Sequence, residues 1–294
     1  MENKVEFKKR REFGEIISDT FLFIKQNFKP LMTAVLYLCG LFLIAGLISS
    51  IMAQLQIVGA MEGIKRGSEY NRFTTLYNFG VGYSFVVIFM VFSYASFYVT
   101  VLSYISIYIQ KGNVAPTVDE VWAYYKYYFF RVLGSGILMT VFLVVCFILC
   151  IVPGIWVFPA VSLFYPIMVI ENAGLGYSFN RCFKLVTDEW WITAATMIVV
   201  SIITVACSYV IQIPAMIIAM ASAFTHLEQP ITKTYAIVTS LAQQLSQVFM
   251  IIPIISTTLI YFNLVERKEN TGLLSRIESL GQTTAPDNST PEEY

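Results

Sequence analysis

Five long stretches of this 294-residue chain contain no Asp, Glu, Lys or Arg: residues 30–61, 73–110, 132–170, 190–227 and 234–265. A helix that crosses the roughly 30 Å hydrocarbon core of a membrane needs about 20 apolar residues. Each stretch is therefore long enough for at least one crossing. Because only helices and closed barrels satisfy their backbone groups in lipid, these stretches predict an all-α polytopic membrane protein.

The third stretch is long enough for two helices, so we predict about six transmembrane helices in all. Pro153-Gly154 lies near its middle, and because proline lacks a helical N–H and glycine permits a turn, we place a hairpin there. The segment after it carries Pro159 and Pro166, and we expect it to be kinked or shallow in the membrane. The predicted spans are about 31–53, 79–108, 132–151, 155–170, 190–220 and 231–262.

Composition supports the membrane class and excludes others. Charged residues make up only 13% of the chain and hydrophobic residues 57%, whereas a soluble domain carries about 25% charge. The 19 basic residues are balanced by 19 acidic ones, and a nucleic-acid binder would show a basic excess. We therefore expect one integral membrane domain over 1–280, a disordered tail at 281–294, and no nucleic-acid partner.

Basic residues are distributed unevenly between the two sides of the predicted membrane. With six spans, one side holds residues 1–30, 111–131, 171–189 and 263–294, which carry 15 of the 19 Lys and Arg residues. The loops of the other side carry the remaining 4. Cytoplasmic segments are enriched in Lys and Arg. The distribution predicts a multi-pass protein of a bacterial inner membrane with both termini in the cytoplasm.

Three cytoplasmic segments have the pattern of amphipathic helices that lie in the membrane interface. They cover about 13–28, the residues after Pro116, where Thr117-Val-Asp-Glu120 matches a capping box, and about 175–190. Leucines and isoleucine at 264–280 suggest a fourth. Aromatic residues suit the headgroup level because they combine an apolar body with a polar tip. The predicted interfacial aromatics are Phe28, Trp122, Tyr128, Trp190 and Trp191.

Each of the first three helices precedes an odd-numbered span. We interpret this order as three copies of one unit, consisting of a surface helix, a span, a turn and a second span. The alternative is that any polytopic protein has aromatic interfaces and amphipathic connectors, without internal repetition.

Several short motifs in the middle of the chain occur in a characteristic order: Val152-Pro-Gly-Ile-Trp156, Phe164-Tyr-Pro166, Val169-Ile-Glu171, Tyr177-Ser-Phe-Asn-Arg181 and Glu189-Trp-Trp191. Over about 115–200 the chain resembles a group of bacterial polytopic proteins. The group includes the membrane domain attached to some glycerophosphoryl diester phosphodiesterases and the YciC-like and DUF975-like families, and the two ends look like a Bacteroidetes version. The phosphodiesterase chemistry of those fusions belongs to a separate barrel domain, so the resemblance transfers no catalytic residues.

The sequence gives little support for catalysis. Metal-dependent hydrolysis needs clustered His and carboxylate ligands, and the chain has one histidine, His226. We therefore expect no enzyme activity, no metal and no cofactor. The favoured function is a scaffold or accessory subunit that contacts membrane lipids and other inner-membrane proteins or a second copy of itself. The alternative is a transporter or permease for a neutral or amphiphilic solute, because prolines in the spans could break helices around a site at the midplane.

Glu171 and Arg181 form the candidate structural pair. Glu171 lies where the fourth predicted span leaves the membrane, and Arg181 lies on the third surface helix. We hypothesise that the pair fixes this helix on the bundle. The alternative is an exposed carboxylate that contributes at most about 1 kcal/mol.

Overall fold

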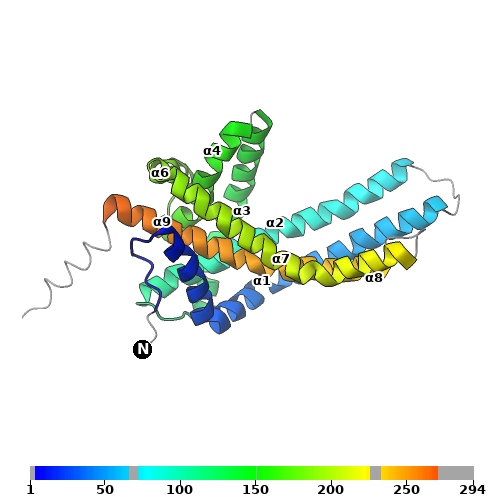
Figure 1. Ribbon diagram of the computed structural model, residues 1–294, viewed down its shortest axis with the longest axis horizontal. Helices are drawn as coiled ribbons and strands as arrows, with labels where there is room; N and C mark the ends of the chain where they lie inside the picture. Colours follow the sequence, from blue (N-terminus) through cyan, green and yellow to red (C-terminus); the bar gives the residue numbers. More distant parts are fainter. Residues whose placement is uncertain (1–3, 66–71, 150, 226–232, 271–294) are drawn as a thin grey trace, which may run out of the picture.

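The computed structural model describes residues 4–65, 72–149, 151–225 and 233–270, and every regular element in these ranges is a helix (Figure 1). Five helical segments are long and apolar enough to cross a membrane, as the sequence predicts for its class. The predicted tail at 281–294 lies outside the described residues. The elements are α1 (Phe13–Lys65), α2 (Arg72–Gln110), α3 (Val118–Leu149), α4 (Ile151–Ser162), α5 (Phe164–Ile170), α6 (Leu175–Val186), α7 (Trp190–Thr225), α8 (Lys233–Ser246), a 3₁₀ turn (Gln247–Met250) and α9 (Ile251–Glu269).

The central element is α9, which contacts α1, α2, α5, α6 and α7. Its side chains are buried without interruption from Ile254 to Glu266. A helix that is apolar on all sides is stable only when other elements cover it. The core of the protein therefore lies around α9, and the five contacting helices pack about this central helix.

Two groups of helices leave this core in different directions. Figure 1 shows α1, α2, α7 and α8 extending to one side as a long arm, while the hairpin of α3 and α4 stands apart from it. The 39 residues of α2 give a length of roughly 60 Å, more than the bilayer core requires. Both groups expose large apolar side chains, including Tyr37, Leu41, Ile148, Leu149 and Met220. Such surfaces are stable in lipid but not in water.

Prolines account for two of the helix breaks. Asn27 in α1 is non-helical (φ −110°, ψ 15°), because Pro30 has no N–H to bond the preceding turn and its ring clashes with the carbonyl of Gln26. This kink separates the predicted surface helix from the first span. Pro253, the third residue of α9, follows the 3₁₀ turn that divides the last span.

The predicted hairpin turn and fourth span need correction. Pro153 and Gly154 do not form the predicted hairpin turn. They belong to the first helical turn of α4, because α3 ends at Leu149 and α4 begins at Ile151. Proline is tolerated there because the first N–H groups of a helix have no intrahelical partner. The predicted span at 155–170 is two short helices, divided at Leu163; Pro159 lies inside α4 and Pro166 in the first turn of α5. The apolar stretch Gly154–Ile170 is shorter than the five candidate spans.

Other predictions have mixed outcomes. The capping box is confirmed, because the Thr117 N–H donates to Glu120 at 2.8 Å and the Glu120 N–H donates to the Thr117 hydroxyl at 3.4 Å. The predicted helix at 264–280 is wrong in its first part: residues 264–269 continue α9, which ends at Asn270 in the left-handed conformation. Residues 271–280 lie outside the described ranges. The hairpin of α3 and α4 stands apart from the arm that contains α1, α2, α7 and α8 (Figure 1). The interpretation of the chain as three copies of one unit rests on the order of the elements and stays a prediction.

Candidate functional site

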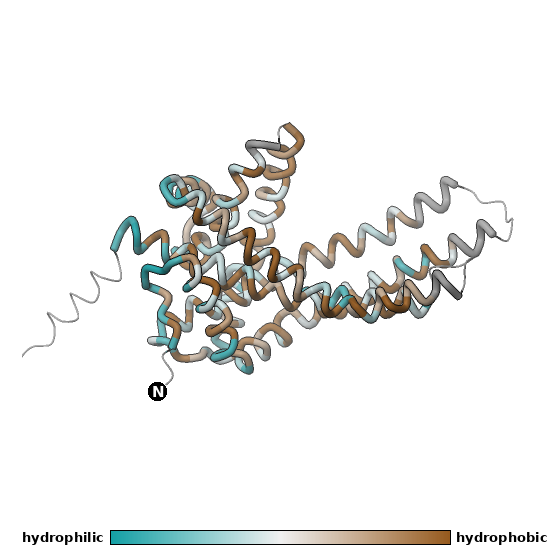
Figure 2. The backbone as a smooth tube through the Cα atoms, viewed as in Figure 1, coloured by the Kyte–Doolittle hydropathy of each residue, from teal (hydrophilic) through white to brown (hydrophobic). Residues whose placement is uncertain are grey.

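Charged side chains gather at one end of the protein, which we call the polar end. Figure 2 shows hydrophilic residues concentrated where the N-terminal segment, α6 and the end of α9 meet. The distribution of Lys and Arg predicts that four sequence segments lie on one side of the membrane, and each of these segments contributes to an ion pair at the polar end. The pairs are Lys9 with Glu15, Lys111 with Glu120, Arg181 with Glu171, and Arg267 with Glu189. Segments far apart in sequence therefore share one polar surface.

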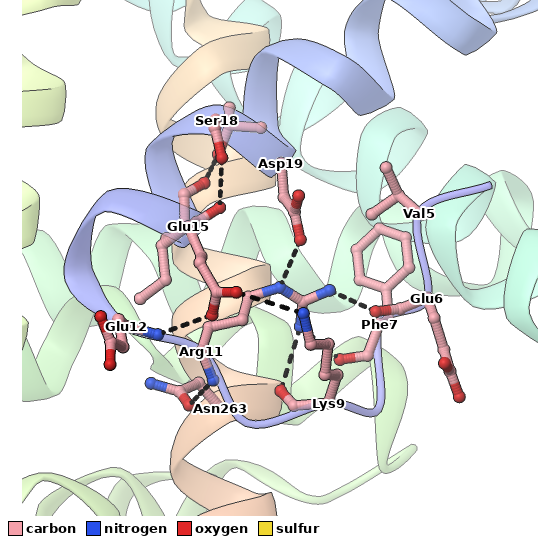
Figure 3. A network of polar contacts seen from close by, with 12 residues as sticks. Val5, Glu6, Phe7, Lys9, Arg11, Glu12, Glu15, Ser18, Asp19 and Asn263 are labelled. Atoms are coloured by element: carbon pink, nitrogen blue, oxygen red, sulfur yellow. Dashed lines mark hydrogen bonds and ion pairs between the residues drawn. The ribbon is translucent and has the colours of Figure 1, made fainter. Parts of the chain in front are cut away.

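Arg11 is the most buried charged side chain at the polar end, with an exposed fraction of 2%. Its Nε donates to the Asp19 carboxylate at 2.8 Å, and its Nη1 donates to the carbonyls of Phe7 at 2.8 Å and Lys9 at 3.1 Å (Figure 3). Its Nη2 donates to the Glu6 carbonyl. The guanidinium thus holds residues 6–9 in a loop against the start of α1, and its five donors suit this arrangement.

The same residue also connects the N-terminal segment to α9. The Arg11 N–H donates to the Asn263 side-chain oxygen at 2.8 Å, and Arg267 donates to the Arg11 carbonyl at 3.1 Å. Phe7 packs edge-on against Phe23, Phe262 and Tyr108, at centroid distances of 5.1, 5.6 and 6.2 Å. Val5, Phe7 and Arg11 therefore anchor the N-terminal segment to the core, while the other side chains of residues 4–12 are exposed.

A second polar cluster joins α6 to α9 through the predicted pair. Arg181 Nε lies 2.9 Å from Glu171, and a different nitrogen of Arg181 lies 2.7 Å from Glu269. The Tyr261 hydroxyl donates to the same Glu171 oxygen at 2.8 Å. Hydrogen bonds to Glu269 and then to Glu171 raise the pKa of Arg181 above its ordinary value. The sequence placed Glu171 and Arg181 together but gave no indication of the other two partners.

Further contacts tie the start of α7 to the end of α9. Arg267 lies 2.8 Å from Glu189, and Lys268 lies 2.8 Å from Asp188. Beside them on α6, burial raises the pKa of the Cys182 thiol to about 12, so this thiol stays protonated at neutral pH. The polar end therefore fixes α1, α6, α7 and α9 relative to one another.

The predicted interfacial aromatics separate into two groups. Phe28, Trp122 and Trp191 are exposed, at 56, 43 and 80%. Trp190 is partly buried and its Nε1 donates to the Trp156 carbonyl at 2.8 Å. Tyr128 is only 5% exposed and belongs to the core, so it does not face the interface as predicted, because its side of α3 packs inward.

The predicted surface helices bury much of their apolar faces against protein. Ile16 and Phe23 of the first helix are at most 1% exposed, and Cys182 and Leu185 of α6 are at most 2% exposed. Phe13 and Phe21 remain outside at 39 and 41%. Sequence periodicity identified these helices, but it could not show whether lipid or protein covers the apolar face.

In the described ranges, the charged groups of the polar end contact one another and not a candidate metal site. They pair across elements, and the described residues contain no cluster of three or more His, Cys, Asp or Glu side chains suited to a metal ion. The sequence does not distinguish the buried Arg11 from Lys8, Lys9 and Arg10, which directly precede it. No protein family, curated protein or solved structure matches this chain, so the resemblance described above stays an expectation.

Proposed function

We propose that this chain is a non-catalytic, multi-pass protein of a bacterial inner membrane that serves as a scaffold or accessory subunit, with its polar end and both termini in the cytoplasm. The observation that carries the proposal is the hairpin of α3 and α4. It stands away from the long arm (Figure 1) and exposes large apolar side chains on several sides, among them Val141, Val145, Ile148, Leu149 and Phe158. A helix of a neighbouring membrane protein would cover this surface.

The path of this hairpin supports the proposed orientation. Lys111 precedes α3 and pairs with Glu120 in the first turn of that helix, and Glu171 follows α5. The hairpin therefore leaves the polar end and returns to it. Trp156, near the tip, stacks on Phe183 of α6 at 6.5 Å. A hairpin that returns to the side it left does not change the side on which the following segments lie. The other four long helices cross the membrane in pairs in this proposal, so both termini lie on the same side.

Site-specific photo-crosslinking in intact cells tests the scaffold role. Ile148 on the hairpin and Tyr37 on α1 are both 78% exposed, so a photoreactive amino acid at each position is a matched pair. We expect the probe at 148 to form a discrete adduct with a second polypeptide and the probe at 37 to label lipid. Labelling of lipid alone from both positions would contradict the proposal.

A second candidate function is movement of a neutral or amphiphilic solute. The specific observation in its favour is the 3₁₀ turn between α8 and α9, which interrupts the helix within the charge-free stretch 234–265. Interrupted helices supply backbone groups to substrate sites in many transporters. Uptake into vesicles that contain only the purified chain would distinguish transport from scaffolding.

A further inference from the structure

A polar cavity of about 210 Å³ lies inside the long arm, between α1, α2, α7, α8 and the 3₁₀ turn. Every residue that lines it belongs to one of the charge-free stretches, so the cavity lies at the depth of the membrane. Its lining nevertheless includes the four amides of Gln212, Gln243, Gln244 and Gln247 and the hydroxyls of Ser50 and Ser208. Polar groups at this depth are costly unless they have partners, and they usually mark a functional site.

The protein satisfies only part of this hydrogen-bonding capacity. Gln247 Nε2 donates to Gln244 Oε1 at 2.6 Å, the Ser50 hydroxyl donates to the Ser240 hydroxyl at 3.2 Å, and the Ser208 hydroxyl donates to the Thr204 carbonyl at 2.9 Å. Within the described ranges, the side chains of Gln212 and Gln243 make no hydrogen bond. An amide offers two donors and an acceptor with two lone pairs. The cavity therefore has capacity for a ligand that both donates and accepts hydrogen bonds.

An apolar groove of about 450 Å³ adjoins the cavity, between α2, α3 and α5. It lies where α3 diverges from α2 (Figure 1). Val91, Ile137 and Val141 are among the apolar residues of its walls. Met90 and Tyr94 line both spaces, so the polar cavity and the apolar groove share a wall and meet at these two residues.

We propose that the cavity and the groove form one binding site for a neutral amphiphile, with its hydroxyl- or amide-bearing head against the glutamines and its hydrocarbon chain in the groove. The lining residues of both spaces carry no Asp, Glu, Lys, Arg or His. A charged head group would find no counter-charge there, at a large cost in a low-dielectric interior. Both spaces are of the size that small-molecule sites occupy, a few hundred Å³.

This site is independent of the scaffold role. It concerns binding, and the inference stands whether or not the bound molecule crosses the membrane. Ile148, the position tested on the hairpin, lines neither space, although Val141 belongs both to the hairpin surface and to the groove. The two tests therefore probe different positions, and the failure of one proposal leaves the other intact.

Photo-labelling of the purified full chain in detergent tests the proposal. The probe is a long-chain monoacylglycerol with a diazirine in its acyl chain, and the comparison probe is the fatty acid with the same diazirine chain. We expect the monoacylglycerol to label peptides of α2 around Met90–Tyr98 and of α3 around Val132–Val141, and unlabelled monoacylglycerol to compete. The anionic fatty acid should label these peptides several-fold less.

Two variants remove opposite ends of the site. Gln212→Leu combined with Gln243→Leu removes the two lining amides that make no hydrogen bond to the described residues, and this double variant should weaken labelling roughly tenfold. Thr140→Trp, at an exposed position on the groove wall, should reduce labelling by filling the groove. Gln56→Leu is the matched control, because Gln56 lies on α1 in the same arm and lines neither space.

The possible results separate clearly. Loss of labelling in the double variant and in Thr140→Trp, with the Gln56→Leu control unchanged, supports the proposal. Equal labelling by the fatty acid, labelled peptides outside the groove-lining helices α2, α3 and α5, or unchanged labelling in Thr140→Trp would overturn it. If the double glutamine variant fails to fold, Thr140→Trp and the two probes still decide the outcome.

Discussion

Substitution of Arg11 by methionine should lower the free energy of unfolding by about 3–5 kcal/mol, the cost of removing one partner from a buried ionic network. The change leaves the carbonyls of Glu6, Phe7 and Lys9 without their shared donor and leaves Asp19 without its ion-pair partner. Methionine has a similar length and no charge, so packing volume is largely kept. The loss comes from polar groups in and around the core that no longer have partners.

The measurement is unfolding of the purified protein in a mild detergent, followed by intrinsic fluorescence. Lys9→Met is the matched control, because Lys9 also pairs with a carboxylate but its side chain and that of Glu15 are about half exposed, at 50 and 46%. We expect this control to lose less than about 1 kcal/mol. Equal losses in the two variants would show that Arg11 does not hold the N-terminal segment.

Glu171 and Arg181 should show strong coupling in a double-mutant cycle. The side chains are 18 and 22% exposed, and each has a second partner, Tyr261 for the glutamate and Glu269 for the arginine. Each single substitution, Glu171→Gln or Arg181→Gln, should therefore cost about 2 kcal/mol, and the coupling energy should be about 1–2 kcal/mol. Partial exposure keeps these values below those of a fully buried pair.

Lys111 and Glu120 provide the comparison for this cycle. Their side chains are 37 and 40% exposed, and the hydrogen bond from Lys111 lowers the pKa of the Glu120 carboxyl. The pair should show a coupling energy below about 1 kcal/mol in the same unfolding assay. Additive effects of Glu171→Gln and Arg181→Gln would contradict the idea that the pair fixes α6 on the bundle.

The distribution of charged residues predicted the all-helical fold class well, because a lipid environment directly restricts where charged residues can occur. A charged side chain is costly in the hydrocarbon core, so charge-free stretches mark the long helices with little ambiguity. The same physics predicted that the four segments rich in basic residues lie on one side, and the ion pairs of Arg181 and Arg267 join two of those segments in the structure. These features depend on composition over many residues and not on the packing of one side chain.

Features that depend on tertiary packing were not predictable. Pro153-Gly154 permits a turn but does not require one, and the first turn of a helix accepts proline equally well. Arg11 is one of four consecutive basic residues, and only the fold shows that Asn263 and Asp19 bond to this one. The glutamines of the polar cavity lie on three separate elements, so only the fold shows that they converge.

The most direct test of the account is the accessibility of single cysteines to a membrane-impermeant maleimide. In a cysteine-free background, Val114→Cys and Tyr177→Cys lie at exposed positions of the polar end, at 47 and 55%, and Ser68→Cys lies in a predicted loop on the opposite side. We predict that Ser68→Cys reacts in intact spheroplasts, whereas the other two react only after the membrane is opened. Reaction of Val114→Cys or Tyr177→Cys in intact spheroplasts would contradict a cytoplasmic polar end.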